Sequence, residues 1–444
     1  MNKESLYVVQ MNPDGRARGI RRRRMILRGI IFLNLMTTAV GYAGEEPLRD
    51  ATLKDCYALA LQRSESLAIQ QEDIREAQGR FSQILSEILP RVSFESSEKK
   101  QGGAGGSPFT LTHVPQRQFV FSQPLFSGFK DFAALAASKA EQKQLAEELK
   151  RARQTLLRDV SDAFYLIKNY QEDLKVLVDI ASDLKDRVVE LKKREELGRS
   201  RASDVASTEA RIYQIEADTQ IVQSQYDVAG QFMEFLTGRK IVSIADEEHE
   251  ANLFSSQEDY ADGVNSRPDV LAAGQAKVAA QKKVAVARAG YFPTVSVDGN
   301  SYTKRVGASA GVDWDVTLQV KVPLFDGLHT KGEIDEARAA SRSAELSENR
   351  VKRQAVLDVQ NSYTQYQGYQ KQRDALKKAV DAAQESYDLQ LEDYKNGLVN
   401  NLDVLQALQD LLTMRRNYIA VQNTVQRAYW NLRIAAGDIT DDTF

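Results

Sequence analysis

The chain has 444 residues, 27% of them charged, and a formal net charge of -3 at neutral pH. It holds only 9 prolines, none of them between Pro124 and Pro268 or after Pro323, and both gaps are rich in Gln, Ala, Glu, Lys, Leu and Arg. This composition is typical of long helices and argues against several compact domains. The single cysteine, Cys56, excludes a disulfide framework and is expected to be a half-buried helical thiol.

Residues 1–43 are predicted to be an export signal peptide. A run of arginines precedes an apolar stretch at 25–40, and small residues follow it. A basic arm that binds nucleic acid would not run straight into such a stretch. No other stretch approaches the roughly 18 apolar residues of a transmembrane helix, so none is expected in the mature chain. The true start, which could be Met25, and the cleavage site stay open.

Two copies of one unit follow the signal. The stretch QFVFSQPLFSG at 118–128 is matched by TLQVKVPLFDG at 317–327, and at the same offset Gly198 corresponds to Gly397. A constant offset through several such landmarks indicates a tandem duplication. The expected divisions are a first repeat at 44–238, a linker or equatorial segment at 239–266, a second repeat at 267–437 and a C-terminal tail at 438–444.

Each repeat is predicted to hold a first helix, two strands, a long helix and a shorter returning helix. Apolar residues in the long helices recur at spacings of 3 and 4, which is the pattern of a coiled-coil seam. The returning helix is too short to cover the long one, so the first helix is expected to stack end to end with it. The expected helices are 50–89, 129–197 and 203–237 in the first repeat, and 267–290, 331–396 and 402–436 in the second.

The strands differ in kind from the helices. From Trp314 to Val322 apolar residues alternate with polar ones, and Phe119 and Phe121 continue the pattern in the first repeat. Such strands suit an outer-membrane barrel, although a small soluble sheet packed on the helices is an alternative. Four strands cannot close a barrel, and open edges are not tolerated in lipid. Three chains would give a closed barrel of twelve strands.

The motifs together resemble the TolC family of outer-membrane efflux channels over about residues 48–437. The resemblance rests on Pro124-Leu-Phe-Ser-Gly, Pro323-Leu-Phe-Asp-Gly, Gly198 with Asp204-Val205, and Tyr394-Lys-Asn-Gly-Leu followed by Leu402-Asp403-Val404-Leu405. It implies a homotrimer whose twelve-stranded barrel, with four strands from each chain, lies in outer-membrane lipid and continues into a long periplasmic α-helical coiled-coil tunnel. It also implies a channel of a tripartite efflux or type I secretion system. The partners would be a periplasmic adaptor (membrane fusion) protein and an inner-membrane pump of the resistance-nodulation-division or ABC type.

The same resemblance assigns roles to several residues. Asp204 and Asp403 match positions near the closed pore constriction. The alternative is that both carboxylates only stabilise helix starts, with Ser203 and Asn401 as nearby caps. The periplasmic tip that binds the adaptor would comprise Gly198, Ser200, Gly397, Leu398 and Val399. The passage from barrel to tunnel would comprise Pro124, Gly128, Pro323 and Gly327, where each proline is expected to end its strand by removing a donor and each glycine to permit the bend. Some family members carry Asp and Arg where this chain has Gln406 and Val399, so the gating contacts stay open.

Enzymatic chemistry finds no support in the sequence. His113, His249 and His329 lack the spacing of metal ligands. The glycine-rich stretch 102–106 lacks the Lys-Ser/Thr of a phosphate loop and predicts an exposed hairpin loop. No cofactor, metal or nucleic-acid partner is expected. A periplasmic coiled-coil adaptor or scaffold that never enters the membrane remains the alternative function, and the cargo stays open.

Overall fold

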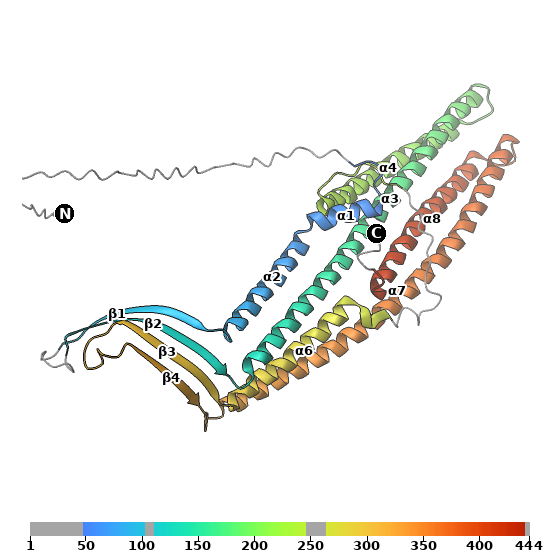
Figure 1. The fold of residues 1–444 in the computed structure, drawn as a ribbon. Helices are drawn as coiled ribbons and strands as arrows, with labels where there is room; N and C mark the ends of the chain where they lie inside the picture. Colours follow the sequence, from blue (N-terminus) through green and yellow to red (C-terminus); the bar gives the residue numbers. More distant parts are fainter. Residues whose placement is uncertain (1–47, 103–110, 246–262, 440–444) are drawn as a thin grey trace, which may run out of the picture. The chain divides into compact units, whose positions relative to one another are not determined.

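The computed structural model describes residues 48–102, 111–245 and 263–439 (Figure 1). The signal peptide predicted at 1–43 and His249 lie outside these residues. The α-helices are α1 (Leu53–Arg63), α2 (Glu65–Ser86), α3 (Lys130–Glu196), α4 (Ala202–Thr237), α6 (Pro268–Arg288), α7 (His329–Lys395) and α8 (Asn401–Ala436). The strands are β1 (Arg91–Lys100), β2 (His113–Phe126), β3 (Thr294–Lys304) and β4 (Trp314–Lys321), and two short 3-10 helices are η1 (Gly263–Ser266) and η2 (Ala289–Tyr291).

The long and returning helices have equal lengths in the two repeats. α3 and α7 each have 67 residues, and α4 and α8 each have 36. α3 and α7 end just before Gly198 and Gly397, whose φ angles of 67° and 77° are left-handed. Backbone N–H groups beyond each glycine return to carbonyls of the last helical turn, such as Leu398 to Asp393 at 2.9 Å. The duplication and the left-handed helix ends are therefore confirmed.

The helices pack as two bundles that share contacts between the repeats. α2 and α4 both pack along α3, while α6 and α8 both pack along α7, which confirms that two shorter helices cover each long one. One apolar cluster, including Leu157 and Trp430, joins α3 to α8, and a second, including Leu184 and Leu408, lies toward the hairpin turns. The predicted seam of α3 is buried at Val160 and at its other central positions, whereas the seam of α7 is mostly half-buried in a single chain.

The first helix of the first repeat is not continuous. It was expected at 50–89, but Ser64 separates α1 from α2 with an extended backbone of φ -63° and ψ 107°. The Ser64 hydroxyl accepts a hydrogen bond from the N–H of Leu67 at 3.3 Å and so caps α2. A serine that bonds the next helical turn competes with helix continuation, which is the physical reason for the break.

The four strands form one antiparallel sheet in the order β1-β2-β3-β4. β1 and β4 are its edges within the chain, and β2 and β3 join the two repeats through pairs such as Phe121 with Gly299. The sheet continues into α3 and α7, and Figure 1 shows the two hairpin turns at the opposite ends of those helices. The residue pattern of this sheet decides what each of its faces contacts.

Sharp bends connect the strands to the long helices. Gly128 and Phe129 are consecutive left-handed residues with φ of 65° and 63°, and Gly327 and Leu328 repeat this with 66° and 70°. At Gly128 an added Cβ would lie 2.7 Å from the Cβ of Phe292, so glycine is also required by space there.

The two prolines at these bends do not behave alike. β4 ends at Lys321, before Pro323. Pro124 instead lies inside β2 opposite Ser296, so the expectation that this proline ends the strand is wrong. β1 pairs with β2 only as far as Ser122, so Pro124 has no β1 partner, and its missing N–H breaks no bond on that side.

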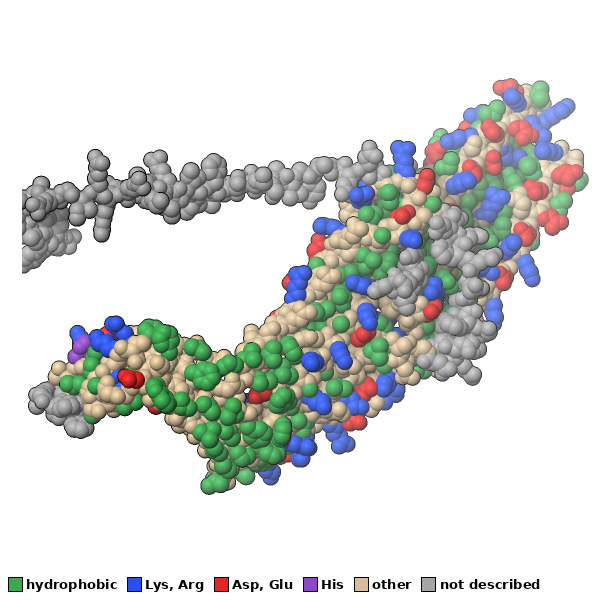
Figure 2. Space-filling model, viewed as in Figure 1, with side chains coloured by type: hydrophobic (Ala, Val, Ile, Leu, Met, Phe, Trp, Pro, Cys, Tyr) green, Lys and Arg blue, Asp and Glu red, His purple; other side chains and the backbone are tan. Residues whose placement is uncertain are grey.

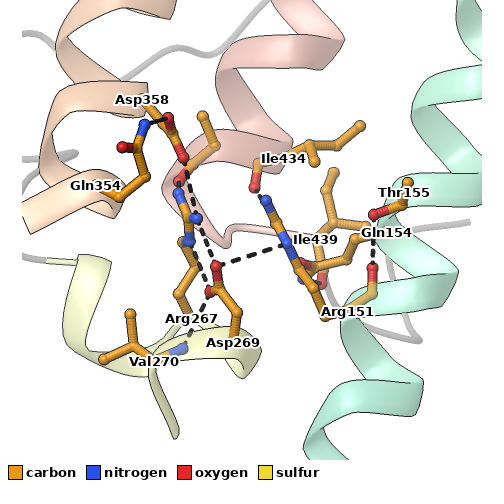
Figure 3. Close-up of polar contacts among 11 residues, drawn as sticks. Arg151, Gln154, Thr155, Arg267, Asp269, Val270, Gln354, Asp358, Ile434 and Ile439 are labelled. Carbon is orange, nitrogen blue, oxygen red and sulfur yellow. Dashed lines mark hydrogen bonds and ion pairs between the residues drawn. The ribbon is translucent and has the colours of Figure 1, made fainter. Parts of the chain in front are cut away.

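A buried ion network joins the start of α6 to three other helices (Figure 3). Arg267, which is 2% exposed, donates to both carboxylate oxygens of Asp269 at 2.8 and 2.6 Å. It also donates to Asp358 of α7 at 3.1 Å and to the backbone carbonyl of Ala435 in α8 at 3.0 Å. Arg151 of α3 lies 3.9 Å from Asp269. The network ties both repeats together where α8 ends.

Candidate functional site

One face of the sheet is apolar along its length. The register places Phe94 opposite Phe119, with ring centroids 5.1 Å apart, and Val297 opposite Leu318. Leu318 is 64% exposed in the single chain. The members of this face, called the apolar belt below, are Val92, Phe94, Phe119, Phe121, Val295, Val297, Trp314, Val316, Leu318 and Val320. An apolar face of this size is stable only where lipid or another apolar surface covers it.

The opposite face of the sheet is polar and internally hydrogen-bonded. Ser122 donates to Asp298 at 2.6 Å, and Tyr302 and Asn300 donate to Asp315 at 2.7 and 2.9 Å. These bonds cross from strand to strand, so they hold the carboxylates in place on that face. An apolar outside and a polar inside are what a water-filled barrel requires.

A second exposed apolar surface lies where the strands meet the long helices. Leu324 is 93% exposed and Phe325 85% exposed. Leu328 lies in the same bend, and Phe132 lies in the first turn of α3. Figure 2 shows hydrophobic side chains gathered at this end of the helices. The surface continues from the apolar belt toward the helices, so water covers it only at a large free-energy cost.

The two hairpin turns at the far ends of the helices carry the predicted tip residues. Gly198, Gly397 and Leu398 are exposed, while Ser200 and Val399 are partly buried. Leu398 is 72% exposed, and Leu197 beside Gly198 is 70% exposed, so both turns present a leucine to their surroundings. The structure places these residues at one end of the helices, as the duplication requires, and their adaptor contact remains a prediction.

Asp204 and Asp403 occupy equivalent positions at the starts of α4 and α8. Each is the third residue of its helix, and each carboxylate accepts a hydrogen bond from the backbone N–H three residues earlier, at 3.3 and 3.1 Å. In α8 the side chain of Asn400 completes the reciprocal pair by accepting from the N–H of Asp403 at 3.2 Å. Both carboxylates therefore stabilise helix starts, whatever further role they have.

The expected helix caps were misplaced by one or two positions. The residues at the N-cap positions are Arg201 and Asn400, not Ser203 and Asn401. Asn401 is fully buried and donates to the carbonyl of Asp204 at 3.2 Å and to the hydroxyl of Thr208 at 3.1 Å. It therefore links the two hairpins.

Arg187 of α3 completes this link, which sequence reasoning missed. Its guanidinium donates twice to the side-chain oxygen of Asn401, at 3.2 and 3.0 Å, and lies 4.6 Å from the ring centroid of Tyr394 in α7. Burial lowers the pKa of Arg187, against the opposing charge of Glu190. The signal was present, because Arg187 is a charged residue three positions after Leu184 and four before Leu191, which places it on the buried side of α3.

Among the residues that the structure describes, no helix is long and apolar enough to cross a membrane. The profile of the outer membrane efflux protein family matches residues 56–239 and 263–438. The chain belongs to that family. It is therefore an outer-membrane efflux channel with a large periplasmic helical tunnel. Members of this family are trimeric channels, and each chain of such a trimer would supply four barrel strands. The alternative of a periplasmic adaptor is not supported, because the family whose model matches the chain is that of outer membrane efflux proteins.

Individual relatives agree with the family assignment. Nodulation protein T of Rhizobium leguminosarum bv. trifolii is 25% identical over 187 residues, and the alignment covers 40% of this chain and only 39% of that protein. The cation efflux system protein CusC of Escherichia coli K12 is 22% identical over 396 residues, covering 83% of each chain. The solved outer-membrane protein VceC of Vibrio cholerae superposes with a TM-score of 0.75 at 21% identity, covering 87% of this chain and 96% of that one.

Proposed function

We propose that this channel is the passive exit duct of a tripartite pump and that its gate lies at the two hairpin turns. The observation that carries this proposal is the equivalent placement of the turns. Equal helix lengths bring both turns to the same end of the helices, each with an aspartate at the third helical position (Figure 1). Three chains would place six such carboxylates around one opening, and a carboxylate ring favours cations over anions.

The link between Arg187, Asn401 and Thr208 gives this gate its resting state. It is a buried polar contact between hairpins that lie in different repeats. Opening the tip by separating the hairpins would break these bonds. Each buried hydrogen bond to a charged group contributes about 1.5–3 kcal/mol, and opening would have to supply that free energy. The free energy for opening would come from the docked partner, because the channel itself carries no energy source in this proposal.

The aspartate ring is tested by removing charge while keeping the helix caps. Asp204→Asn with Asp403→Asn retains an oxygen acceptor at each helix start, so the trimer should assemble as before. In planar bilayers with a salt gradient, the reversal potential should shift toward weaker cation preference. The control, Asp183→Asn with Asp388→Asn, removes the same charge from exposed positions of α3 and α7 further from the turns. Unchanged selectivity in the first variant would leave both aspartates as helix caps only.

The adaptor contact is proposed for the turn residues Ser200, Leu398 and Val399. The native thiol is buried at Cys56, so a single cysteine placed at the tip would be the reactive one. Val399→Cys carrying a photo-crosslinker should capture the periplasmic adaptor in cells, whereas Ser182→Cys on the shaft of α3 should not. Equal capture at both positions would refute docking at the tip.

The pump in this assembly is proposed to be of the resistance-nodulation-division or the ABC type. Family members are channels that work with periplasmic adaptors and inner-membrane pumps, and CusC is named as a component of a cation efflux system. Mass spectrometry of the complex captured at Val399→Cys would identify the pump class. A captured complex that holds an adaptor with neither pump type would contradict this part of the proposal.

A further inference from the structure

A group of charged residues lies beyond the apolar belt, at the ends of the strands that are furthest from the helices. We define it as the cationic rim: Lys100, His113, Arg117 and Lys304, grouped around Glu98. The register pairs Lys100 with His113 and Arg117 with Lys304. In Figure 2, Lys, Arg and His side chains gather at this end of the sheet, next to hydrophobic ones.

The rim lies on the same face of the sheet as the apolar belt. Side chains two positions apart on a strand share a face. Glu98 and Lys100 therefore follow Phe94 on β1, and Arg117 precedes Phe119 on β2. Strict alternation along β3 would point Lys304 to the polar face, together with Asn300 and Tyr302. The register of β2 with β3 shifts between Arg117 and Gln118, however, and this shift places Lys304 opposite Arg117. A bulge that re-aims a lysine onto the lipid-facing side is a specific feature of this sheet.

The charges of the rim are only partly paired. Glu98 lies 2.6 Å from the Nε2 atom of His113 and 3.6 Å from Arg117. The rim thus holds one carboxylate, three permanent cations and one histidine. The side chains of His113 and Arg117 remain 53% and 48% exposed. The rim therefore keeps a net positive charge that is accessible from outside the barrel.

Assembly of the trimer leaves this surface free. Barrel closure pairs the edges of β1 and β4 with neighbouring chains and does not cover the outward face. The helices leave the opposite end of the sheet, toward the periplasm, so the rim lies at the level of the outer leaflet's headgroups. A cationic surface directly above a lipid-facing apolar belt matches a phosphorylated lipid, whose acyl chains and phosphates occur in that same order.

We propose that the cationic rim binds the phosphate groups of a phosphorylated glycolipid of the outer leaflet. Arg117 offers a guanidinium that can hold a phosphate with two hydrogen bonds, and Lys304 and Lys100 add point charges beside it. Glu98 orients Arg117 and His113 and reduces the affinity by its own charge. The apolar belt below holds the acyl chains of the same lipid.

The test titrates purified trimers in neutral detergent with bis-phosphorylated lipid A and counts bound lipid by native mass spectrometry. Arg117→Gln with Lys304→Gln should lower the affinity by roughly fivefold for each charge, or roughly 25-fold for the pair. The control, Lys99→Gln with Lys321→Gln, removes two charges from the polar face and should change little. Glu98→Gln should bind roughly fivefold more tightly, because it removes the opposing charge.

The wild-type trimer supplies a second measurement that needs no variant. Dephosphorylated lipid A should bind far more weakly than the phosphorylated form, and millimolar inorganic phosphate should compete poorly because it lacks acyl chains. Equal binding of the two lipids would overturn the proposal, as would equal loss in the rim and control variants. Competition by free phosphate as strong as that by the lipid would identify a simple anion site and would also overturn it. The proposed gate at Asp204 and Asp403, which is tested by the reversal potential in planar bilayers, stands or falls independently of these results.

Discussion

Removing the buried guanidinium of Arg267 should destabilise the helical part of the channel. Breaking a buried ion pair by deleting one partner typically costs about 3–5 kcal/mol, because the other charge stays buried and unpaired. Here Asp269 and Asp358 are 27% and 34% exposed, so water reaches them, and Arg151 remains 3.9 Å away. We therefore expect about 2–3 kcal/mol for Arg267→Met. At about 1–2 °C for each kcal/mol in a chain of this length, the thermal midpoint should fall by about 2–6 °C.

The assay is circular dichroism at 222 nm during heating of the purified trimer in detergent. Arg75→Gln serves as the control, because Arg75 forms an exposed i,i+3 pair on α2 and such pairs contribute less than about 1 kcal/mol. Adding Asp358→Asn to Arg267→Met should recover part of the loss, since the remaining carboxylate, Asp269, still has Arg151 3.9 Å away. A midpoint for Arg267→Met within 1 °C of the wild type, as a rough threshold, would refute the reasoning.

The same network predicts how stability depends on pH. Burial pushes the pKa of Asp269 upward, but the hydrogen bond from Arg267 and the charges of Arg151 and Arg267 outweigh it, so the pKa lies below its usual value. A lowered carboxyl pKa stabilises the folded state above the unfolded pKa of about 3.9, and this contribution is lost as pH falls through the folded value. The difference in midpoint between wild type and Arg267→Met should therefore narrow below about pH 4.

Three further predictions concern other parts of the chain. Leu318→Lys puts a charge on the apolar belt, at a cost of about 2–4 kcal/mol near the bilayer midplane, and should reduce heat-resistant trimer in outer-membrane fractions, whereas Gln319→Lys on the polar face should not. Burial, followed by repulsion from Asp55, raises the pKa of the Cys56 thiol to about 12, so it should resist alkylation at pH 8 in the native trimer and react after unfolding. Arg187→Met should raise the resting conductance in planar bilayers, and a conductance equal to that of the wild type would show that its link does not restrain the tip.

The long helices were predictable because their signals repeat over many turns. The seam of α3 extends over dozens of residues, and Gly198 and Gly397 mark where the helices stop. A single residue that departs from the pattern matters little over so many helical turns. α3 and α7 accordingly begin within two residues of the expected start. The strands were predictable for a similar reason, since alternation on Trp314–Lys321 allows one face only.

The predictions that were wrong all concern places where two local interactions compete, and a sequence pattern does not show which of them forms. Ser64 ends α1 because its hydroxyl accepts a hydrogen bond from the N–H of Leu67 in the first turn of α2. Pro124 stays inside β2 because β1 has already stopped pairing. The sequence predicts a cap at Asn401, but the neighbouring Asn400 occupies that position, and Asn401 contacts the other repeat instead. Each outcome depends on a partner that is distant in sequence or on one hydrogen bond.

The unpaired edges of β1 and β4 have a consequence for inheritance. A lone subunit cannot enter lipid with open edges, so insertion waits until sibling chains supply the missing neighbours. Wild-type and defective subunits made in the same cell would assemble into the same closed barrels, called rings here. An allele that folds and pairs normally but blocks the duct would then impair most rings containing it, and it would behave as dominant, whereas an allele that cannot pair would be recessive.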